Sequence, residues 1–134
     1  LLKEKKLINR ILNSFGTNYE VKKESEINAF TAISGSGPAY VTYLLEALVT
    51  ANQSLGATKK QSEEIALSLF KDTIAMIDND FSLKKIQNLQ KQITSKGGTT
   101  EAALKVFNKK RLSNILKQGM KEGKKRADML GKIN

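Results

Sequence analysis

The segment with the clearest capacity for chemistry is residues 95–100, which read SKGGTT. Its adjacent glycines, Gly97 and Gly98, allow a sharp turn and leave backbone N–H groups exposed. Thr99 and Thr100 then begin a predicted helix, whose first turn offers unpaired N–H donors and about half a positive charge. Such a helix start suits a carboxylate or a phosphate. Plain N-capping by threonine would produce the same pattern without a ligand.

A second glycine-rich segment, residues 34–40, reads SGSGPAY. It is not a dinucleotide-binding fingerprint, because the third glycine is missing at the required spacing and no clear strand precedes it. It is not a phosphate-binding P-loop either, because no lysine follows its last glycine. A tight turn that joins two helices and lets their backbones pass closely would also produce this segment.

The chain contains neither histidine nor cysteine among its 134 residues. A Ser-His-Asp triad, a Cys-His dyad, a disulfide framework and a conventional zinc site are therefore excluded within it. We identify no metal ligand in the sequence. Any chemistry must rely on positioning, hydrogen bonds and helix dipoles, or on a cofactor held elsewhere.

The formal net charge of +10 invites an interpretation as a nucleic-acid-binding protein. We favour a lysine-rich solvated surface, because the lysines are spread along the chain and the few aromatic residues are not interleaved with them. The stretch 27–45 carries no charge, but SGSGP interrupts it, so it indicates a buried core segment rather than a membrane span. Residues 1–6 are charged and amphipathic, unlike a signal peptide, and we expect a cytoplasmic protein.

Apolar periodicity and capping residues predict an all-α fold. The expected helices span residues 1–15, about 38–55, 58 to 77 or 80, 83–93, 99–107 and 111–130. Residues 28–33 are expected to form a short helix or turn that the SGSGP segment interrupts. Ser36 or Gly37 should cap the helix that follows. Residues 18–21 favour a short strand, although the sequence shows no partner for it.

Two further helix starts carry capping signals. Thr58 and Gln61 have capping-box spacing, and Ser82 stands where an N-cap is expected. The helix that begins after Thr58 is expected to bury one face in the core. That face consists of Ala66, Leu69, Phe70, Thr73 and Ile77.

The helix expected at 38–55 is apolar around most of its circumference. One strip consists of Tyr40, Tyr43, Leu44, Ala47, Leu48, Ala51 and Leu55, and a second of Val41, Leu45 and Val49. So wide a face in so small a domain predicts burial against a partner chain. The last helix carries three small residues spaced four apart, Gly119, Gly123 and Ala127. They would admit another helix closely, either from the same chain or from a partner.

Two segments together resemble one protein family. Residues 24–48, ESEINAFTAISGSGPAYVTYLLEAL, are similar to the start of the C-terminal domain of pyrroline-5-carboxylate reductases, and residues 93–107, ITSKGGTTEAALKVF, resemble that family's second signature. Their order and separation also fit, and the resemblance extends to about Leu130. The chain departs from the family at Asn28, where aspartate is usual, and at Lys96, where proline is usual.

The resemblance implies an interlocking helical dimerisation domain of the type found at the C-terminus of 6-phosphogluconate dehydrogenase. Residues 1–22 would then be a remnant of the preceding nucleotide-binding Rossmann domain, and residues 23–134 the dimerisation and substrate-binding domain. An unpaired strand at 18–21 is what such a remnant would leave. The family uses NADPH or NADH, but no cofactor-binding residue can be named in this chain.

The resemblance also implies a reaction, the reduction of 1-pyrroline-5-carboxylate to L-proline by hydride transfer in proline biosynthesis. The substrate-binding residues would be Ser95, Gly97, Gly98, Thr99 and Thr100. The Ser95 hydroxyl and the N–H groups of Thr99 and Thr100 would hold the carboxylate. The Thr100 hydroxyl would bond the ring nitrogen as the catalytic group. The implied assembly is a homodimer or a larger oligomer, and the chain alone should be inactive.

Three other interpretations remain at this stage. The chain could be the helical dimerisation domain of a different Rossmann-linked dehydrogenase, whose substrate residues would differ. It could be a basic helical protein that binds nucleic acid, with salt-dependent affinity. It could also be a purely structural oligomerisation domain, in which the GGTT segment would be replaceable without consequence.

Overall fold

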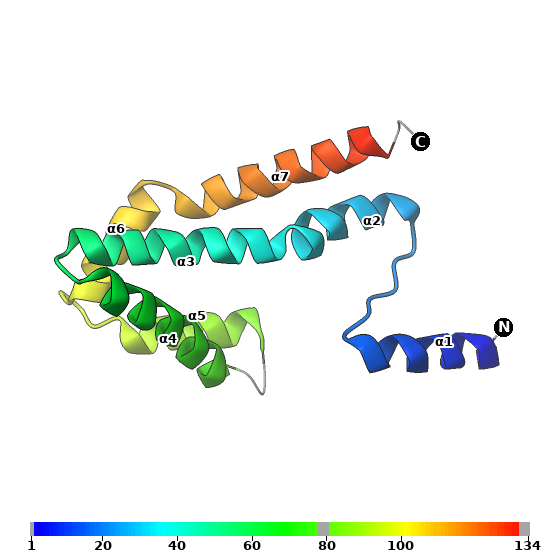
Figure 1. Cartoon of the computed structure of the whole chain (residues 1–134), viewed down its shortest axis with the longest axis horizontal. Coiled ribbons are helices and arrows are strands. Elements are labelled where there is room, and N and C mark those ends of the chain that lie inside the picture. The colour runs from blue at the N-terminus through cyan, green and yellow to red at the C-terminus, as the bar shows by residue number, and fades with distance from the viewer. Residues whose placement is uncertain (1, 78–80, 132–134) are drawn as a thin grey trace.

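The structure is a computed structural model, and it describes residues 2–77 and 81–131. These residues form helices and no strand, which confirms the predicted all-α fold (Figure 1). The elements are α1 (Leu2–Phe15), α2 (Glu24–Phe30), a π-helical turn (Thr31–Gly35), α3 (Gly37–Ser54), α4 (Lys59–Ile77), α5 (Leu83–Ile93), α6 (Thr99–Lys109) and α7 (Leu112–Leu130).

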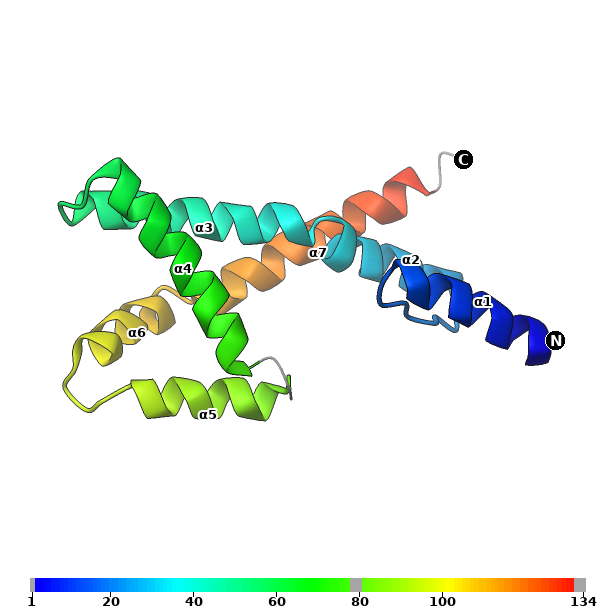
Figure 2. The same ribbon diagram turned by 60° about the horizontal axis from the view of Figure 1, so that its bottom comes forward.

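The molecule is elongated and open, with the start of α1 and the end of α7 at the same end (Figure 1). Helix α2, the π-helical turn and α3 follow one another as a long rod, and α7 packs on α2 and on the π-helical turn. Helices α3 and α4 form a hairpin at the other end. In the turned view, α7 crosses α3, while α4, α5 and α6 diverge from that pair (Figure 2).

The predicted interruption at residues 34–38 is confirmed only in part, because α2 and α3 are separate α-helices but a π-helical turn connects them. The Ser36 backbone has right-handed helical angles (φ −90°, ψ −12°), and its N–H donates to the Thr31 carbonyl at 3.2 Å. This bond spans five residues instead of the four of an α-helix. It therefore forms a π-helical turn, which connects α2 to α3. Pro38 lies in the first turn of α3, where a missing N–H costs nothing. Ser36 occupies the N-cap position, but its side chain makes no capping bond.

Helix α1 and the link after it stand apart from the rest of the molecule (Figure 1). The strand expected at 18–21 is wrong, because these residues have no regular structure and no partner strand exists in the described ranges. A ring contact connects this region to α2, and an ion pair joins α1 to the link. The Tyr19 ring stacks on Phe30 with 6.1 Å between ring centroids, and Lys5 Nζ lies 2.6 Å from Glu20 Oε1.

The predicted helix starts after Thr58 and Ser82 are confirmed. The Thr58 N–H donates to Gln61 Oε1 at 3.0 Å, and the Gln61 N–H donates back to Thr58 Oγ1 at 3.3 Å, which completes a capping box. Ser82 Oγ accepts from the Lys85 N–H at 3.2 Å. Helix α4 ends at Ile77, and the alternative end at Asp80 lies outside the described residues.

The predicted core face of α4 is confirmed only in part. Ala66 and Ile77 are buried and Phe70 is half-buried, whereas Leu69 and Thr73 are exposed. Ser62, which was not expected in the core, is fully buried with its hydroxyl donating to the Thr58 carbonyl at 2.9 Å.

Little of the apolar surface is covered within one chain. Among the described residues only Ala32, Ser62, Ala66 and Ile77 are buried. The accessible surface is 11831 Å², whereas a compact monomer of 14.8 kDa would expose about 7,000 Å². Helix α3 has no buried residue at all. A single chain therefore does not provide the burial that the sequence of α3 predicts.

Candidate functional site

The predicted functional segment forms the connection between α5 and α6. Helix α6 begins at Thr99, as expected, with Gly98 as its N-cap residue. The Gly98 N–H donates to the Ser95 carbonyl at 3.1 Å, which closes a tight turn over residues 95–98. The structure thus brings Ser95, Gly97, Gly98, Thr99 and Thr100 together at one helix start.

Both glycines of this turn are required by its geometry. Gly97 has a φ of +75°, a left-handed conformation that side chains with a Cβ rarely adopt. A Cβ on Gly98 would collide with Ser95 Oγ and lie 3.2 Å from the Ser95 carbonyl oxygen. The Ser95 hydroxyl therefore sits directly against the N-cap of α6, next to the first N–H groups of the helix.

Three of those N–H groups, of Thr99, Thr100 and Glu101, have no acceptor within the described residues. The first backbone bond that closes α6 runs from the Ala102 N–H to the Gly98 carbonyl at 3.1 Å. Both threonines lie at the positive end of the helix dipole. The helix start can consequently accept an anion with two backbone donors and the neighbouring Ser95 hydroxyl.

One residue of this site was missed by the sequence reasoning. The Gly97 N–H donates to Glu101 Oε2 at 2.8 Å, and the same oxygen lies 3.2 Å from Lys105 Nζ. Glu101 occupies the third helical position after Gly98, where an acidic side chain commonly reaches back to the residues before the helix. That spacing was available in the sequence and could have identified it.

The described residues contain no cluster of three or more acidic side chains that could hold a metal ion. No described helix is both long enough and apolar enough to cross a membrane. The functional groups at the loop are therefore backbone N–H and hydroxyl donors and the ion pair between Glu101 and Lys105.

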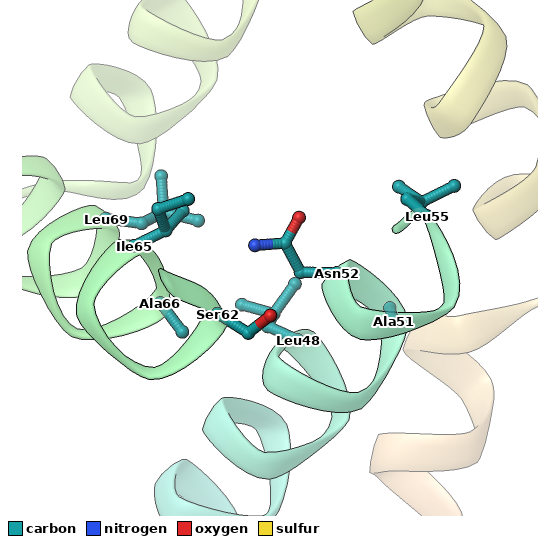
Figure 3. A pocket seen from close by; sticks show the side chains of 8 residues that line it. All are labelled: Leu48, Ala51, Asn52, Leu55, Ser62, Ile65, Ala66 and Leu69. Carbon is teal, nitrogen blue, oxygen red and sulfur yellow. The ribbon is translucent and has the colours of Figure 1, made fainter. Parts of the chain in front are cut away.

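An apolar pocket of about 220 Å³ lies elsewhere, between the end of α3 and the start of α4 (Figure 3). Its lining residues are Leu48, Ala51, Asn52, Leu55, Ser62, Ile65, Ala66 and Leu69. The Asn52 amide extends from α3 into the space between the helices, and its Nδ2 is buried with no hydrogen-bond partner. None of the predicted substrate-binding residues lines this pocket.

A second apolar groove runs between α3 and α7, and Tyr40, Tyr43 and Met120 contribute to it. Two glycines of α7 near this groove differ in what surrounds them. A Cβ on Gly123 would lie 3.1 Å from Tyr40 Oη, so Gly123 serves packing within the chain. A Cβ on Gly119 would meet no atom within 4 Å, so Gly119 faces open space in the groove.

The departure from the family at Asn28 has a structural reason. Asn28 Nδ2 donates to Asp128 Oδ1 at 2.9 Å, and Lys124 Nζ lies 2.7 Å from Asp128 Oδ2. These contacts join α2 to the end of α7. An aspartate at position 28 would place one carboxylate against another, whereas the asparagine amide donates a hydrogen bond.

Comparison with known proteins agrees with the resemblance in sequence. The family model described as pyrroline-5-carboxylate reductase dimerisation matches residues 24–130. The pyrroline-5-carboxylate reductase of Staphylococcus saprophyticus is 39% identical over 108 residues, which cover 81% of this chain and 39% of the relative. That of Staphylococcus haemolyticus is 40% identical over 116 residues, which cover 86% of this chain and 41% of the relative.

Solved structures give the same result. A pyrroline-5-carboxylate reductase from Coxiella burnetii superposes with a TM-score of 0.84 at 32% identity, over 96% of this chain and 47% of that one. Pyrroline carboxylate reductase from Plasmodium falciparum, solved with NADP bound, superposes with a TM-score of 0.82 at 30% identity, over 96% of this chain and 48% of that one. The chain spans about two fifths of the length of the relatives that it matches in sequence. Since the family model covers most of the chain, the protein belongs to the pyrroline-5-carboxylate reductase dimerisation family.

Proposed function

We propose that this chain is the substrate-binding and dimerisation part of an NAD(P)H-dependent pyrroline-5-carboxylate reductase, which reduces 1-pyrroline-5-carboxylate to L-proline. The observation that carries the proposal is the pair of unpaired N–H groups of Thr99 and Thr100 beside the Ser95 hydroxyl. These donors match the carboxylate of a small cyclic amino acid precursor. They lie in the segment that carries the family's second signature.

In this proposal the loop binds and orients the substrate. The N–H groups of Thr99 and Thr100 and the hydroxyl of Ser95 hold the carboxylate, which the positive end of α6 also attracts. Gly97 and Gly98 contribute through their backbone conformation, because the N–H of each already has an acceptor in the chain. The substrate can approach the backbone closely where these residues lack side chains.

Thr100 is the proposed catalytic residue, and its hydroxyl would bond the ring nitrogen. A protonated cyclic imine is already electrophilic, so the protein chiefly needs to orient it and exclude water. NAD(P)H, when bound by residues outside this chain, would supply the hydride for the reduction of the imine. No histidine or cysteine is needed for this chemistry, in keeping with their absence from the chain.

The nucleotide would be held by residues outside this chain. The described residues contain no strand followed by a glycine-rich turn and a helix, which is the usual dinucleotide cradle. We propose that residues 1–22 belong to a preceding Rossmann domain and that residues 23–134 form the helical domain. The exposed apolar side chains of α1, which include Leu7, Ile11 and Phe15, support a partner for this helix outside the described contacts.

The proposed assembly is a homodimer in which the helices of two copies interlock, as in the C-terminal domain of 6-phosphogluconate dehydrogenase. The single chain exposes about 4,800 Å² more surface than a compact monomer of its size would. Part of that excess is surface for a second copy to cover, since obligate homodimer interfaces bury about 1,000–2,500 Å² or more of each chain. The groove at Gly119 and the exposed Tyr43 provide an apolar surface for a second copy.

The proposal is tested in the two-domain enzyme by replacing Thr100 with alanine. Loss of one good hydrogen bond, about 1.5–3 kcal/mol, should lower kcat roughly ten- to a hundredfold. Thr99→Ala is the matched control, since it removes a neighbouring hydroxyl but keeps both N–H groups. Steady-state kinetics with 1-pyrroline-5-carboxylate measure both variants. Equal activity of Thr100→Ala and the parent enzyme would remove Thr100 from the site.

A second experiment tests whether the nucleotide site lies outside this chain. The chain by itself should show no reductase activity and no heat of binding when it is titrated with NADPH. Micromolar affinity in that calorimetric titration would contradict the assignment of the nucleotide site to the other domain.

A further inference from the structure

Glu101 makes the contact that holds the left-handed residue of the α5–α6 turn. Its Oε2 accepts from the Gly97 N–H at 2.8 Å, and Gly97 has a φ of +75°. The Glu101 side chain is 31% exposed, much less than the 71% of its partner Lys105. A partly buried carboxylate bonded to a backbone N–H is a stronger tether than a neutral side chain would be. The turn is thus fixed at two points, by Glu101 and by the bond from Gly98 to Ser95.

The hydrogen bond from Gly97 to Glu101 also affects which N–H groups of the loop are available to a ligand. The donors of Gly97 and Gly98 are both occupied within the loop, by Glu101 and by the Ser95 carbonyl. The donors of Thr99 and Thr100 have no recorded acceptor in the described residues and point from the start of α6. An anion arriving at this loop therefore meets the open donors of the first turn of α6, without competition from the N–H groups of Gly97 and Gly98.

A carboxylate in the first turn of α6 has an electrostatic cost for a site that receives an anion, because like charges repel. Lys105 lies one helical turn further on, with Nζ 3.2 Å from Glu101 Oε2. The ammonium group offsets the Glu101 charge without occupying the loop itself. The arrangement keeps the acceptor that the turn needs while reducing the repulsion that it would cause.

We propose that Glu101 is a positioning residue for substrate binding, which holds the Gly97 turn, and that Lys105 neutralises its charge. This inference rests on the proposed function, because it concerns the affinity of the same loop for the substrate carboxylate. It separates two roles of one side chain. The hydrogen-bond acceptor is required for the geometry of the loop, whereas the negative charge is a disadvantage that Lys105 compensates.

Three substitutions in the two-domain enzyme distinguish these roles. Glu101→Ala removes acceptor and charge, Glu101→Gln keeps an acceptor oxygen without the charge, and Lys105→Met removes only the compensating charge. Glu101→Ala should raise KM for 1-pyrroline-5-carboxylate about tenfold with kcat within about twofold. Glu101→Gln should have a KM no higher than that of the parent enzyme.

The Lys105→Met variant tests the charge. Its KM should rise roughly threefold at low salt and return toward the parent value at high salt, because exposed charges are screened. In a Glu101→Gln background the same substitution should have no effect on KM. Persistence of the Lys105→Met effect in that background would overturn the neutralising role of Lys105.

A measurement without substrate examines the tether directly. Amide hydrogen exchange of Gly97 should be faster in Glu101→Ala than in the parent enzyme and in Glu101→Gln, and circular dichroism confirms that each variant is folded. Unchanged KM and unchanged Gly97 exchange in Glu101→Ala would overturn this inference alone. A parent enzyme that neither reduces 1-pyrroline-5-carboxylate nor binds L-proline would overturn the proposed function, and this inference with it.

Discussion

The α5–α6 loop and helix α3 differ in how many of their contacts a single chain provides. Every contact that shapes the loop comes from residues 95–105, a stretch of the chain shorter than α3 itself. Helix α3 makes its packing contacts with α4 and with the π-helical turn, yet none of its residues is buried. The loop is therefore shaped within one chain, whereas the apolar surface of α3 would be covered only by a second copy in the proposed homodimer.

This difference predicts which substitutions affect assembly and which affect the loop alone. The largest effect is expected at Tyr43, which is 71% exposed in the single chain and lines apolar surface on α3. Aromatic residues of this kind contribute strongly to protein interfaces. Tyr43→Glu should weaken dimerisation by about 2 kcal/mol or more, roughly a thirtyfold or larger increase in dissociation constant. Sedimentation equilibrium measures it.

Gln53→Glu is the control for that experiment, because it adds one negative charge at an exposed polar position of the same helix. It should leave the dissociation constant nearly unchanged. If Tyr43→Glu and the parent chain formed dimers of equal strength, or if the parent were a compact monomer, the contrast between α3 and the loop would lose its basis.

An intermediate effect is expected inside the loop, at Gly97. Alanine at a φ of +75° is strained, and Gly97→Ala should lower the free energy of unfolding by about 1–2 kcal/mol without changing the dimer. Gly37→Ala provides the comparison, because its φ is not left-handed and no atom lies within 4 Å of the added Cβ. That variant should match the parent or be more stable by up to about 1 kcal/mol.

Urea denaturation at one fixed protein concentration compares these two variants, since dimer stability depends on concentration. A dissociated Gly97→Ala protein would show that the loop is coupled to assembly. The two regions would then no longer be independent.

The smallest effect is expected where α2 meets α7, at Asn28. Asn28→Asp replaces the amide that donates to Asp128 Oδ1 with a second carboxylate, and should cost about 1 kcal/mol of folding stability at neutral pH. Adding Asp128→Asn to that variant restores a donor opposite the new carboxylate and should recover most of the loss. Urea titration at pH 7 measures both. Equal stability of Asn28→Asp and the parent would contradict this role of the amide.

Local signals in the sequence predicted the helix boundaries well. The capping box at Thr58, the N-cap at Ser82 and the helix start at Thr99 all act over three or four residues, so the sequence alone was sufficient. Glu101 belongs to the same class of signal, although its reach back to Gly97 was not anticipated. The turn and helix start that hold the candidate site residues were accordingly predicted from local signals, and the roles of these residues stay a prediction.

The errors arose where the outcome depends on distant partners. Residues 18–21 have the composition of a strand, but a strand requires a second strand to pair with, and the described chain has none. The glycines at 34–38 indicated a break, and the structure instead connects α2 and α3 by a π-helical turn that contacts α7. Leu69 and Thr73 follow the correct period for burial but find no neighbour to cover them.

The sequence by itself determined the helical elements and the donors of the α5–α6 loop, because capping, glycine conformation and helix polarity act between residues that are close along the chain. Only the tertiary structure decided which surfaces are covered. The Asn28–Asp128 contact joins positions 100 residues apart. Gly123 packs close to Tyr40, whereas Gly119 has no neighbouring atom within 4 Å of an added Cβ. Burial depends on which distant surfaces meet, and periodicity specifies that a face is apolar without specifying what covers it.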